Sequence, residues 1–507
     1  MWNSFPVRWY RKGIRMEFDD TVNQIKLFQR AGENVKLVLL CYMPELRRFL
    51  HREGIQNIEI WSVFDVIQGI KGQLPGIFSY HDMSWPDDLE WVYTPFLALA
   101  YRNDEKYAKV EFGEGGHAVF AELYRKGKIS RRIYIDDRGF LSCALDFQNE
   151  KEVRRTYFDQ DGKWRVREDL QTGAVTVNPK IANVFQKLEY SSMSDLILEV
   201  LSDSFENEVG EGVVITAYDN RHNEMVRQVA RGRKMVFSLF QKRNQIRDFN
   251  LAAEDMFRYA DMIVTDTEYL ANHLRKLEAA KDCRIMDLSP YDARVSLGKS
   301  QRIRELKILC YLQDLQDEQM AGVKQLLCYV NGHRDTELII GVGNSLDEQL
   351  ARQYLETETE RIVSKNRLNN IYPEKNKQEY SENEIQEEYK KNVLIRSCRS
   401  ETEIIEILKE MRIIVELSPE PDLYLQIAGI SAGVPMVLKK DSQYVTHQEN
   451  GWILQEMNEL DDALDYFLNG LENWNKSLVH SVHKIAGYTN GAIVKRWKEL
   501  LETRDQS

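Results

Sequence analysis

The sequence predicts an α/β protein of two Rossmann-type domains, with an antiparallel β-sheet inserted in the N-terminal half. Three observations predict this fold class. Short apolar strands alternate with amphipathic helices near both ends of the chain, as in βαβ units on a parallel sheet. A region between them shows short alternating runs separated by glycine-containing turns, which is typical of antiparallel hairpins. A stretch without periodicity then separates the two α/β regions.

Length and composition limit the classes of protein that need to be considered. The chain has 507 residues, of which 43% are hydrophobic and 29% charged, as in an ordinary globular protein of several domains. Its 68 basic and 80 acidic residues give a net charge of −12, which argues against a nucleic-acid partner. The six cysteines are scattered without a CxxC pair, and no signal peptide or membrane-spanning run is apparent. We therefore expect a cytoplasmic protein.

The N-terminal half is predicted to form one α/β domain in two parts, residues 1–105 and 181–290. The first part contains the apolar run VKLVLLCY between two helical patterns, and the second contains GVVITAYD and RKMVFSLF. Residues 106–180 are the predicted antiparallel insertion, with runs such as HAVFAELY and turns such as KGK and DDRG. This sheet is either purely structural or a docking face, because another chain could extend its edge strands.

A second α/β domain is predicted over residues 291–507. The periodicity lapses in LSPYDARVSLGKSQRIRE and resumes with LKILCYL, a helical pattern and TELIIGVGN. Residues 356–389 are rich in Glu, Asn, Lys and Gln, and we assign no site to them. Apolar residues at helical spacing after residue 456 predict terminal helices packed on this domain.

The string VELSPEPDLYLQIAGISAGVPMVLKKDSQYVTHQENGWIL resembles the nucleotide-binding domain of retaining GT-B glycosyltransferases. That resemblance implies a glycine-rich turn opening a helix, a Glu, seven residues, a second Glu, a small residue, Gly, any residue and Pro. The segment from Ala432 to Pro435 fits the end of this pattern. Counting back from Pro435 places Glu420 at the first Glu and Ala428 at the second. Alanine offers no acceptor for ribose hydroxyls, so the ribose-binding carboxylate is missing.

A different register does not restore that carboxylate. If Glu416 is taken as the first Glu, Tyr424 stands at the second position. The diphosphate site is also altered, because Pro419 and Pro421 donate no N–H to a phosphate. The resemblance further implies an Arg and a Lys after the first strand of the domain. In their place stand Gln313 or Asp314 for the Arg and Gln319 for the Lys.

We therefore predict a vestigial donor site with no catalytic residue, no metal and no cofactor. Its positions are Gln313, Asp314, Gln319, Glu420 and Ala428. The alternative is that the alignment is wrong and the protein is an active GT-B glycosyltransferase using a nucleotide-sugar donor.

Several strings along the chain are similar to one family, the first of the three accessory secretory proteins of the accessory Sec system of Gram-positive bacteria. They are FPVRWY, LRRFLHREG, MSWPDDLEWVYTPF, DDRGFLSCALDF and the linker LSPYDARVSLGKSQRIRELKI. The resemblance implies a non-catalytic, GT-B-like component that works with two sister proteins and the accessory SecA ATPase. It also implies a role in cytosolic glycan handling and in the export of a serine-rich-repeat glycoprotein adhesin.

One basic cluster is a candidate for contact with a membrane surface. It consists of Arg227, Arg231, Arg233 and Lys234. Such a cluster could meet anionic lipid headgroups or an acidic partner, which would make the protein peripheral at the cytoplasmic face of the membrane. A solvated turn between a helix and a strand is the alternative.

Overall fold

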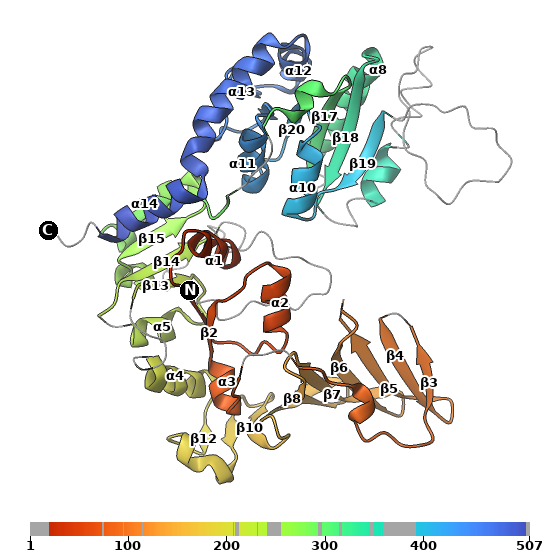
Figure 1. Cartoon of the computed structure of the whole chain (residues 1–507), viewed down its shortest axis with the longest axis vertical. Coiled ribbons are helices and arrows are strands. Elements are labelled where there is room, and N and C mark those ends of the chain that lie inside the picture. The colour runs from red at the N-terminus through yellow and green to blue at the C-terminus, as the bar shows by residue number, and fades with distance from the viewer. Residues whose placement is uncertain are drawn as a thin grey trace. The chain divides into compact units, whose positions relative to one another are not determined.

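The computed structural model describes residues 20–72, 76–94, 96–113, 115–205, 207, 212–230, 232–240, 255–292, 297–313, 317–343, 349–355, 357 and 392–502. The chain divides into two compact units, Met1–Leu288 and Ser289–Ser507 (Figure 1). Both units contain parallel sheets with helices between successive strands, and the N-terminal unit also contains a long antiparallel sheet. This is the α/β class with an antiparallel insertion that the sequence predicts.

The α/β part of the N-terminal unit consists of short parallel strands and the helices between them. Strands β1 (Lys36–Leu39) and β2 (Glu59–Ser62) pair in parallel. A four-stranded parallel sheet has the order β13 (Val214–Ala217), β14 (Met235–Leu239), β15 (Met262–Thr265) and β16 (Arg284–Asp287). The helices are α1 (Asp20–Arg30), α2 (Leu46–Arg52), α3 (Val63–Gln68), α4 (Met193–Ser204), α5 (Asn223–Val229) and α7 (Glu268–Leu274). Short 3-10 helices are η2 (Tyr80–Asp82), η3 (Pro179–Val184, kinked at Ile181), η6 (Phe257–Tyr259) and η7 (Glu278–Ala280).

The inserted sheet has ten antiparallel strands, which pair in chain order. They are β3 (Glu90–Tyr93), β4 (Leu97–Arg102), β5 (Glu105–Phe112), β6 (Ala118–Arg125), β7 (Lys128–Asp136), β8 (Phe140–Gln148), β9 (Lys151–Phe158), β10 (Trp164–Asp169), β11 (Val175–Val177) and β12 (Glu189–Tyr190). The sheet therefore extends on both sides of the predicted interval 106–180. Strand β4, LALAYR, lacks an apolar/polar alternation because its half-buried positions Leu97, Leu99 and Tyr101 are apolar or aromatic like its buried alanines. Strand β12 has too few residues to show a period.

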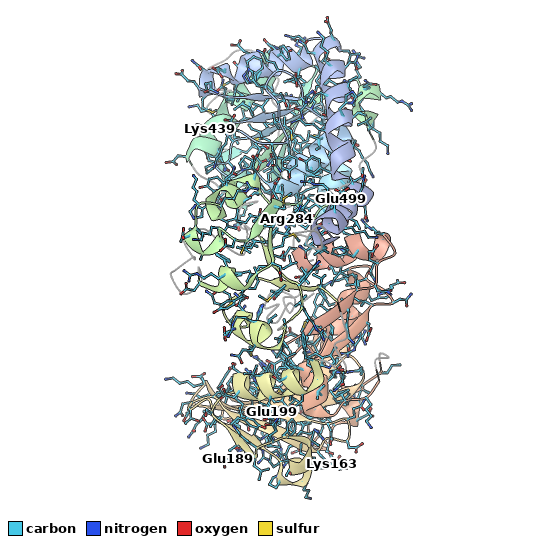
Figure 2. The ribbon with its side chains drawn as sticks, turned by 90° about the vertical axis from the view of Figure 1, so that its left-hand side faces the viewer. Lys163, Glu189, Glu199, Arg284, Lys439 and Glu499 are labelled. Carbon is cyan, nitrogen blue, oxygen red and sulfur yellow. The ribbon has the colours of Figure 1, made fainter. Side chains whose placement is uncertain are left out.

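The two faces of this sheet are covered in different ways. Cys143, Tyr157 and Val166 belong to the same buried core as Phe64 of α3, so this face packs on the α/β part of the unit. On the opposite face, Ala98 and Ala121 pack with aromatic residues that precede or begin β3, including Tyr80, Trp85 and Trp91. The small alanines leave room for these rings. Lys163 in the β9–β10 turn and Glu189 of β12 both lie toward one end of the unit, on different sides of it (Figure 2).

A buried charge cluster joins the β7–β8 turn to helices α2 and α3. Arg138 donates two hydrogen bonds to Asp65 of α3, at 3.0 and 2.9 Å, and two to Asp136, at 2.6 and 2.8 Å. Asp137 accepts the backbone N–H groups of Arg47 and Arg48, at 2.6 and 3.1 Å, in the first turn of α2. The cluster ties together segments that lie more than 70 residues apart in the sequence.

Asp137 gives the N-terminal unit a defined pH dependence. Burial of the carboxyl group, together with the neighbouring charge of Asp136, raises the pKa of Asp137 to about 6. The folded state therefore binds the proton of the Asp137 carboxyl group more tightly than the unfolded state. The stability that this bound proton provides is lost as pH rises through 6. Relative to the wild type, Asp137→Asn should gain roughly 2 kcal/mol of stability between pH 4.5 and pH 7.5. Urea unfolding at the two pH values measures this difference, and an unchanged difference between the two proteins would contradict the assignment.

The C-terminal unit is a doubly wound parallel sheet of six strands. Their order is β19 (Val393–Ser397), β18 (Thr336–Val342), β17 (Leu306–Leu312), β20 (Ile413–Glu416), β21 (Met436–Leu438) and β22 (Gly451–Ile453). The helices are α8 (Asp317–Gly332), α10 (Glu401–Leu408), α11 (Leu423–Ala432), α12 (Leu460–Leu468), α13 (Glu472–Ile485) and α14 (Asn490–Glu502). Single 3-10 turns are η8 (Lys299–Arg302), η9 (Met457–Glu459) and η10 (Ala486–Tyr488). Strand order reverses between β17 and β20, and ligands of such folds bind outside the carboxyl ends of the strands at this point.

Candidate functional site

The switch point of the C-terminal unit brings two of the predicted donor positions together. Gln313 follows β17, and its side-chain amide donates to Glu416 Oε1 at 2.6 Å and to the backbone carbonyl of Glu420 at 3.0 Å. Glu416 is the last residue of β20 and is fully buried. The side chain that stands where the resemblance implies an Arg is thus neutral and is already engaged by the protein's own acceptors.

The N-terminus of α11, where a donor diphosphate would lie, is also satisfied from within the chain. The N–H of Asp422 donates to Glu416 Oε1 at 2.6 Å. Asp422 is the N-cap, and its Oδ1 accepts the N–H of Leu425 at 2.9 Å. Free N–H groups and the positive end of the helix dipole normally attract phosphate to such a position. Here the buried carboxylates of Glu416 and Asp422 accept these N–H groups, and their negative charge would repel a phosphate group.

Ala428 lies in the middle of α11, a helix whose residues are all buried. It cannot accept a hydrogen bond from a ribose hydroxyl. A Cβ atom on the next residue, Gly429, would come within 2.8 Å of Met436 Sδ and 3.0 Å of Ile414 Cδ1, so the helix packs closely on the sheet here. In the alternative register, Tyr424 is buried with its ring edge-on to Tyr291, at 5.4 Å between centroids. Neither register places a carboxylate at the second position.

The two remaining predicted donor positions are Asp314 and Gln319. Asp314 lies outside the described residues. Gln319 is in the first turn of α8 and is 1% exposed. Both polar atoms of its side-chain amide lack a hydrogen-bond partner among the described residues. A buried amide in this state costs about 1–3 kcal/mol of desolvation, and no hydrogen bond with the described residues offsets it.

Gln319→Met should therefore stabilise the protein. Methionine has a similar length and no polar atom to desolvate, so we expect the free energy of unfolding to rise by about 1 kcal/mol. Equilibrium urea unfolding measures the change. A clear loss of stability would show instead that the amide makes a favourable contact.

Glu416 lies at the switch point but is not one of the five predicted donor positions. Its Oε1 joins the end of β17 to the start of α11, since it accepts from both Gln313 and Asp422. The sequence contains a signal for it, because the apolar run IIVE ends in a carboxylate at the carboxyl end of a predicted strand. Glu420 itself is exposed, and the hydrogen bonds described for it use its backbone carbonyl and N–H.

The loop after β21 keeps its shape through internal hydrogen bonds. Asn450 is fully buried, accepts the N–H of Thr446 at 2.7 Å and donates to the carbonyl of Tyr444 at 2.8 Å. A cavity of about 570 Å³ adjoins this loop, lined by residues that include His447, Trp452 and Lys484. None of the predicted donor positions lines it.

The basic cluster of the N-terminal unit is largely engaged by neighbouring side chains. Arg227 forms an ion pair with Glu224 and lies over the ring of Tyr259. Arg233 lies over the ring of Phe205, and Arg231 is outside the described residues. No helix in the described part of the chain has the length and apolar character needed to cross a membrane. The described residues also contain no group of three or more His, Cys, Asp or Glu side chains arranged to hold a metal ion.

Comparisons with known proteins match nearly the whole chain to one family. The matching family model is that of an accessory Sec system protein, accessory secretory protein 1. It matches residues 1–504. The corresponding protein of Streptococcus gordonii is 36% identical over 509 residues, covering 99% of this chain and 96% of that protein. The corresponding protein of Staphylococcus aureus is 28% identical over 508 residues, with the same coverage.

Solved structures agree with the fold. A chain in the structure of accessory secretory proteins 1, 2 and 3 of Streptococcus pneumoniae has a TM-score of 0.78 and 29% identity, covering 97% of this chain and 94% of that chain. A chain of the Glycosylation Associate Protein (Gap123) complex of Streptococcus agalactiae has a TM-score of 0.79 and 32% identity, covering 96% and 95%. The pneumococcal O-GlcNAc transferase GtfA, at 11% identity, reaches 0.71 over 97% of this chain and 98% of its own, which shows a shared GT-B fold. The chain belongs to the accessory Sec system protein family of accessory secretory protein 1, built on a GT-B-like fold.

Proposed function

We propose that this protein is a non-catalytic subunit of an accessory Sec complex, in which it assembles with the two other accessory secretory proteins in the cytoplasm. The complex would serve glycan handling and export of a serine-rich-repeat glycoprotein adhesin by the accessory SecA ATPase. Gln313, Asp314, Gln319, Glu420 and Ala428 are then relics of a donor site. The basic cluster at Arg227 offers a weaker route to a lipid surface, because Arg227 is already paired with Glu224.

One observation carries the non-catalytic part of this proposal. The N-terminus of α11 is capped by Glu416 and Asp422, so the position of a donor diphosphate already holds the protein's own negative charge. The relatives in solved structures support the assembly part, since the pneumococcal structure contains accessory secretory proteins 1, 2 and 3 together.

The competing function is that of an active glycosyltransferase with non-standard donor contacts. The amide of Gln319 favours it, because this amide has no hydrogen-bond partner within the described ranges and a nucleotide could satisfy it. The two functions differ in what Gln319→Met should do. A scaffold tolerates this change, whereas a transferase that uses the amide would lose activity.

Co-expression with the two sister proteins tests the proposal. We expect a single complex of the three proteins on gel filtration, and adhesin export that is lost on deletion of this gene. Export should return in full with either the wild-type gene or the Gln319→Met variant. A protein that stays monomeric beside both sisters, or export that fails only with Gln319→Met, would contradict the proposal.

A further inference from the structure

The two edges of the ten-stranded sheet are protected to different degrees. At one edge, β12 has only two residues, and the hydroxyl of Tyr190 donates to Glu199 of α4 at 2.8 Å. At the other edge, β3 pairs with β4 alone. Proteins usually protect an edge strand with a lysine, a proline, a bulge or a covering element. Strand β3, at the end of the sheet in Figure 1, reads EWVY and contains neither residue. Its ladder with β4 runs without a bulge.

The hydrogen-bond register shows which backbone groups of β3 face outward. The N–H of Thr94 donates to the carbonyl of Leu97 at 2.9 Å, so these two residues form a hydrogen-bonded pair. Such pairs alternate along an antiparallel ladder, and Val92 and Glu90 therefore bond to β4 as well. Trp91 and Tyr93 direct their N–H and C=O groups away from β4. Among the described residues no strand pairs with that side of β3.

The side chains around this edge divide into an apolar end and an acidic end. Val92, Tyr93 and Phe96, at or just after the end of β3, are 51%, 59% and 66% exposed. Val92 and Tyr93 face opposite sides of the sheet, so both faces of this end are apolar. Asp87, Asp88 and Glu90 are exposed at the beginning of the strand. Arg102 forms an ion pair with Asp88 at 2.7 Å. Among the described residues it is the cation paired with one of these three carboxylates.

We propose that β3 is the docking edge for one of the two sister accessory secretory proteins, which adds an extended strand to the ten-stranded sheet. This inference rests on the proposed function, which supplies the partner. The acidic end and the apolar end of β3 indicate the composition of the added strand. It should carry basic residues opposite the acidic end and apolar residues opposite Val92 and Tyr93. A second copy of this chain fits less well, because it brings the same acidic run and a net charge of −12.

Two variants alter this edge without removing a β3–β4 backbone hydrogen bond. Tyr93→Pro removes an outward N–H, at a position where proline costs no bond to β4. Val92→Lys places a charge where the docked strand is expected to present apolar residues, so it disfavours docking. Tyr93→Phe keeps the N–H and serves as the control for the first variant. Val184→Lys serves for the second, because Val184 in η3 of the same unit is 49% exposed, nearly as much as Val92.

The test is the affinity of each purified variant for the two co-purified sister proteins, with thermal unfolding as a check on folding. We expect Tyr93→Pro and Val92→Lys to weaken binding at least about 10-fold, with both controls unchanged. If Tyr93→Pro fails to fold, Val92→Lys decides. Wild-type affinity in both edge variants would overturn this inference and leave the proposed function intact, whereas a wild type that binds neither sister would remove the proposed function itself. A wild type that dimerises alone, with the dimer lost in Tyr93→Pro, would identify a second copy as the occupant and also overturn the inference.

Discussion

Arg138→Met should destabilise the N-terminal unit by about 3–5 kcal/mol. The guanidinium group of Arg138 is 4% exposed and makes four hydrogen bonds to the carboxylates of Asp65 and Asp136. Asp65 and Asp136 themselves are 14% and 2% exposed. Methionine fills a similar volume but leaves these carboxylates buried without their shared cation. Loss of one partner of a buried ion pair costs far more than the pair itself contributes.

Chemical denaturation followed by far-UV circular dichroism measures this change. Arg154→Met is the matched control, since Arg154 is 51% exposed and pairs with Asp146 on the surface of the sheet. That exposed pair should contribute less than about 1 kcal/mol. Equal effects of the two substitutions would mean that the Arg138 cluster does not hold the β7–β8 turn to α2 and α3.

Glu416→Ala should destabilise the C-terminal unit by about 2–4 kcal/mol. The substitution removes one oxygen that accepts both the N–H of Asp422 and the amide of Gln313, each at 2.6 Å. The Asp422 N–H is buried and would lose its partner at the start of α11. Glu416→Gln is the matched control, because its amide oxygen can accept both bonds.

The same two variants separate the structural role of Glu416 from a role in ligand binding. Thermal unfolding should show a large loss for Glu416→Ala and less than half of that loss for Glu416→Gln. Neither variant should gain affinity for a nucleotide sugar, since Asp422, Gln319 and Ala428 are unchanged. A stable Glu416→Ala protein would show that the capping of α11 does not depend on this carboxylate.

The sequence predicts the fold well because its parallel strands are buried on both sides and appear as continuous apolar runs. LKILCYL and TELIIGV become β17 and β18 for this reason. The limits of the inserted sheet are harder to predict, because β4 has apolar residues at both its buried and its half-buried positions and β12 is only two residues long. Neither strand shows the period-2 signal from which strands are recognised.

For the candidate site, the sequence predicts only which donor-binding groups are missing. Residue types suffice to show that Ala428 offers no acceptor and that Gln313 carries no charge. They do not show that Gln313, Glu416 and Asp422 bond to one another, because these residues lie up to 109 positions apart and meet only where β17 and β20 pair. The role of Glu416 depends on that strand pairing, which is a property of the fold.

Isothermal titration of the purified protein with UDP-GlcNAc and UDP-glucose tests the central claim most directly. The donor position of the C-terminal unit is closed by Glu416 and Asp422, and the amide of Gln313 is already bonded. We expect no measurable heat of binding at millimolar nucleotide sugar. A dissociation constant in the low micromolar range, abolished by Gln319→Met, would contradict the claim and establish a working donor site.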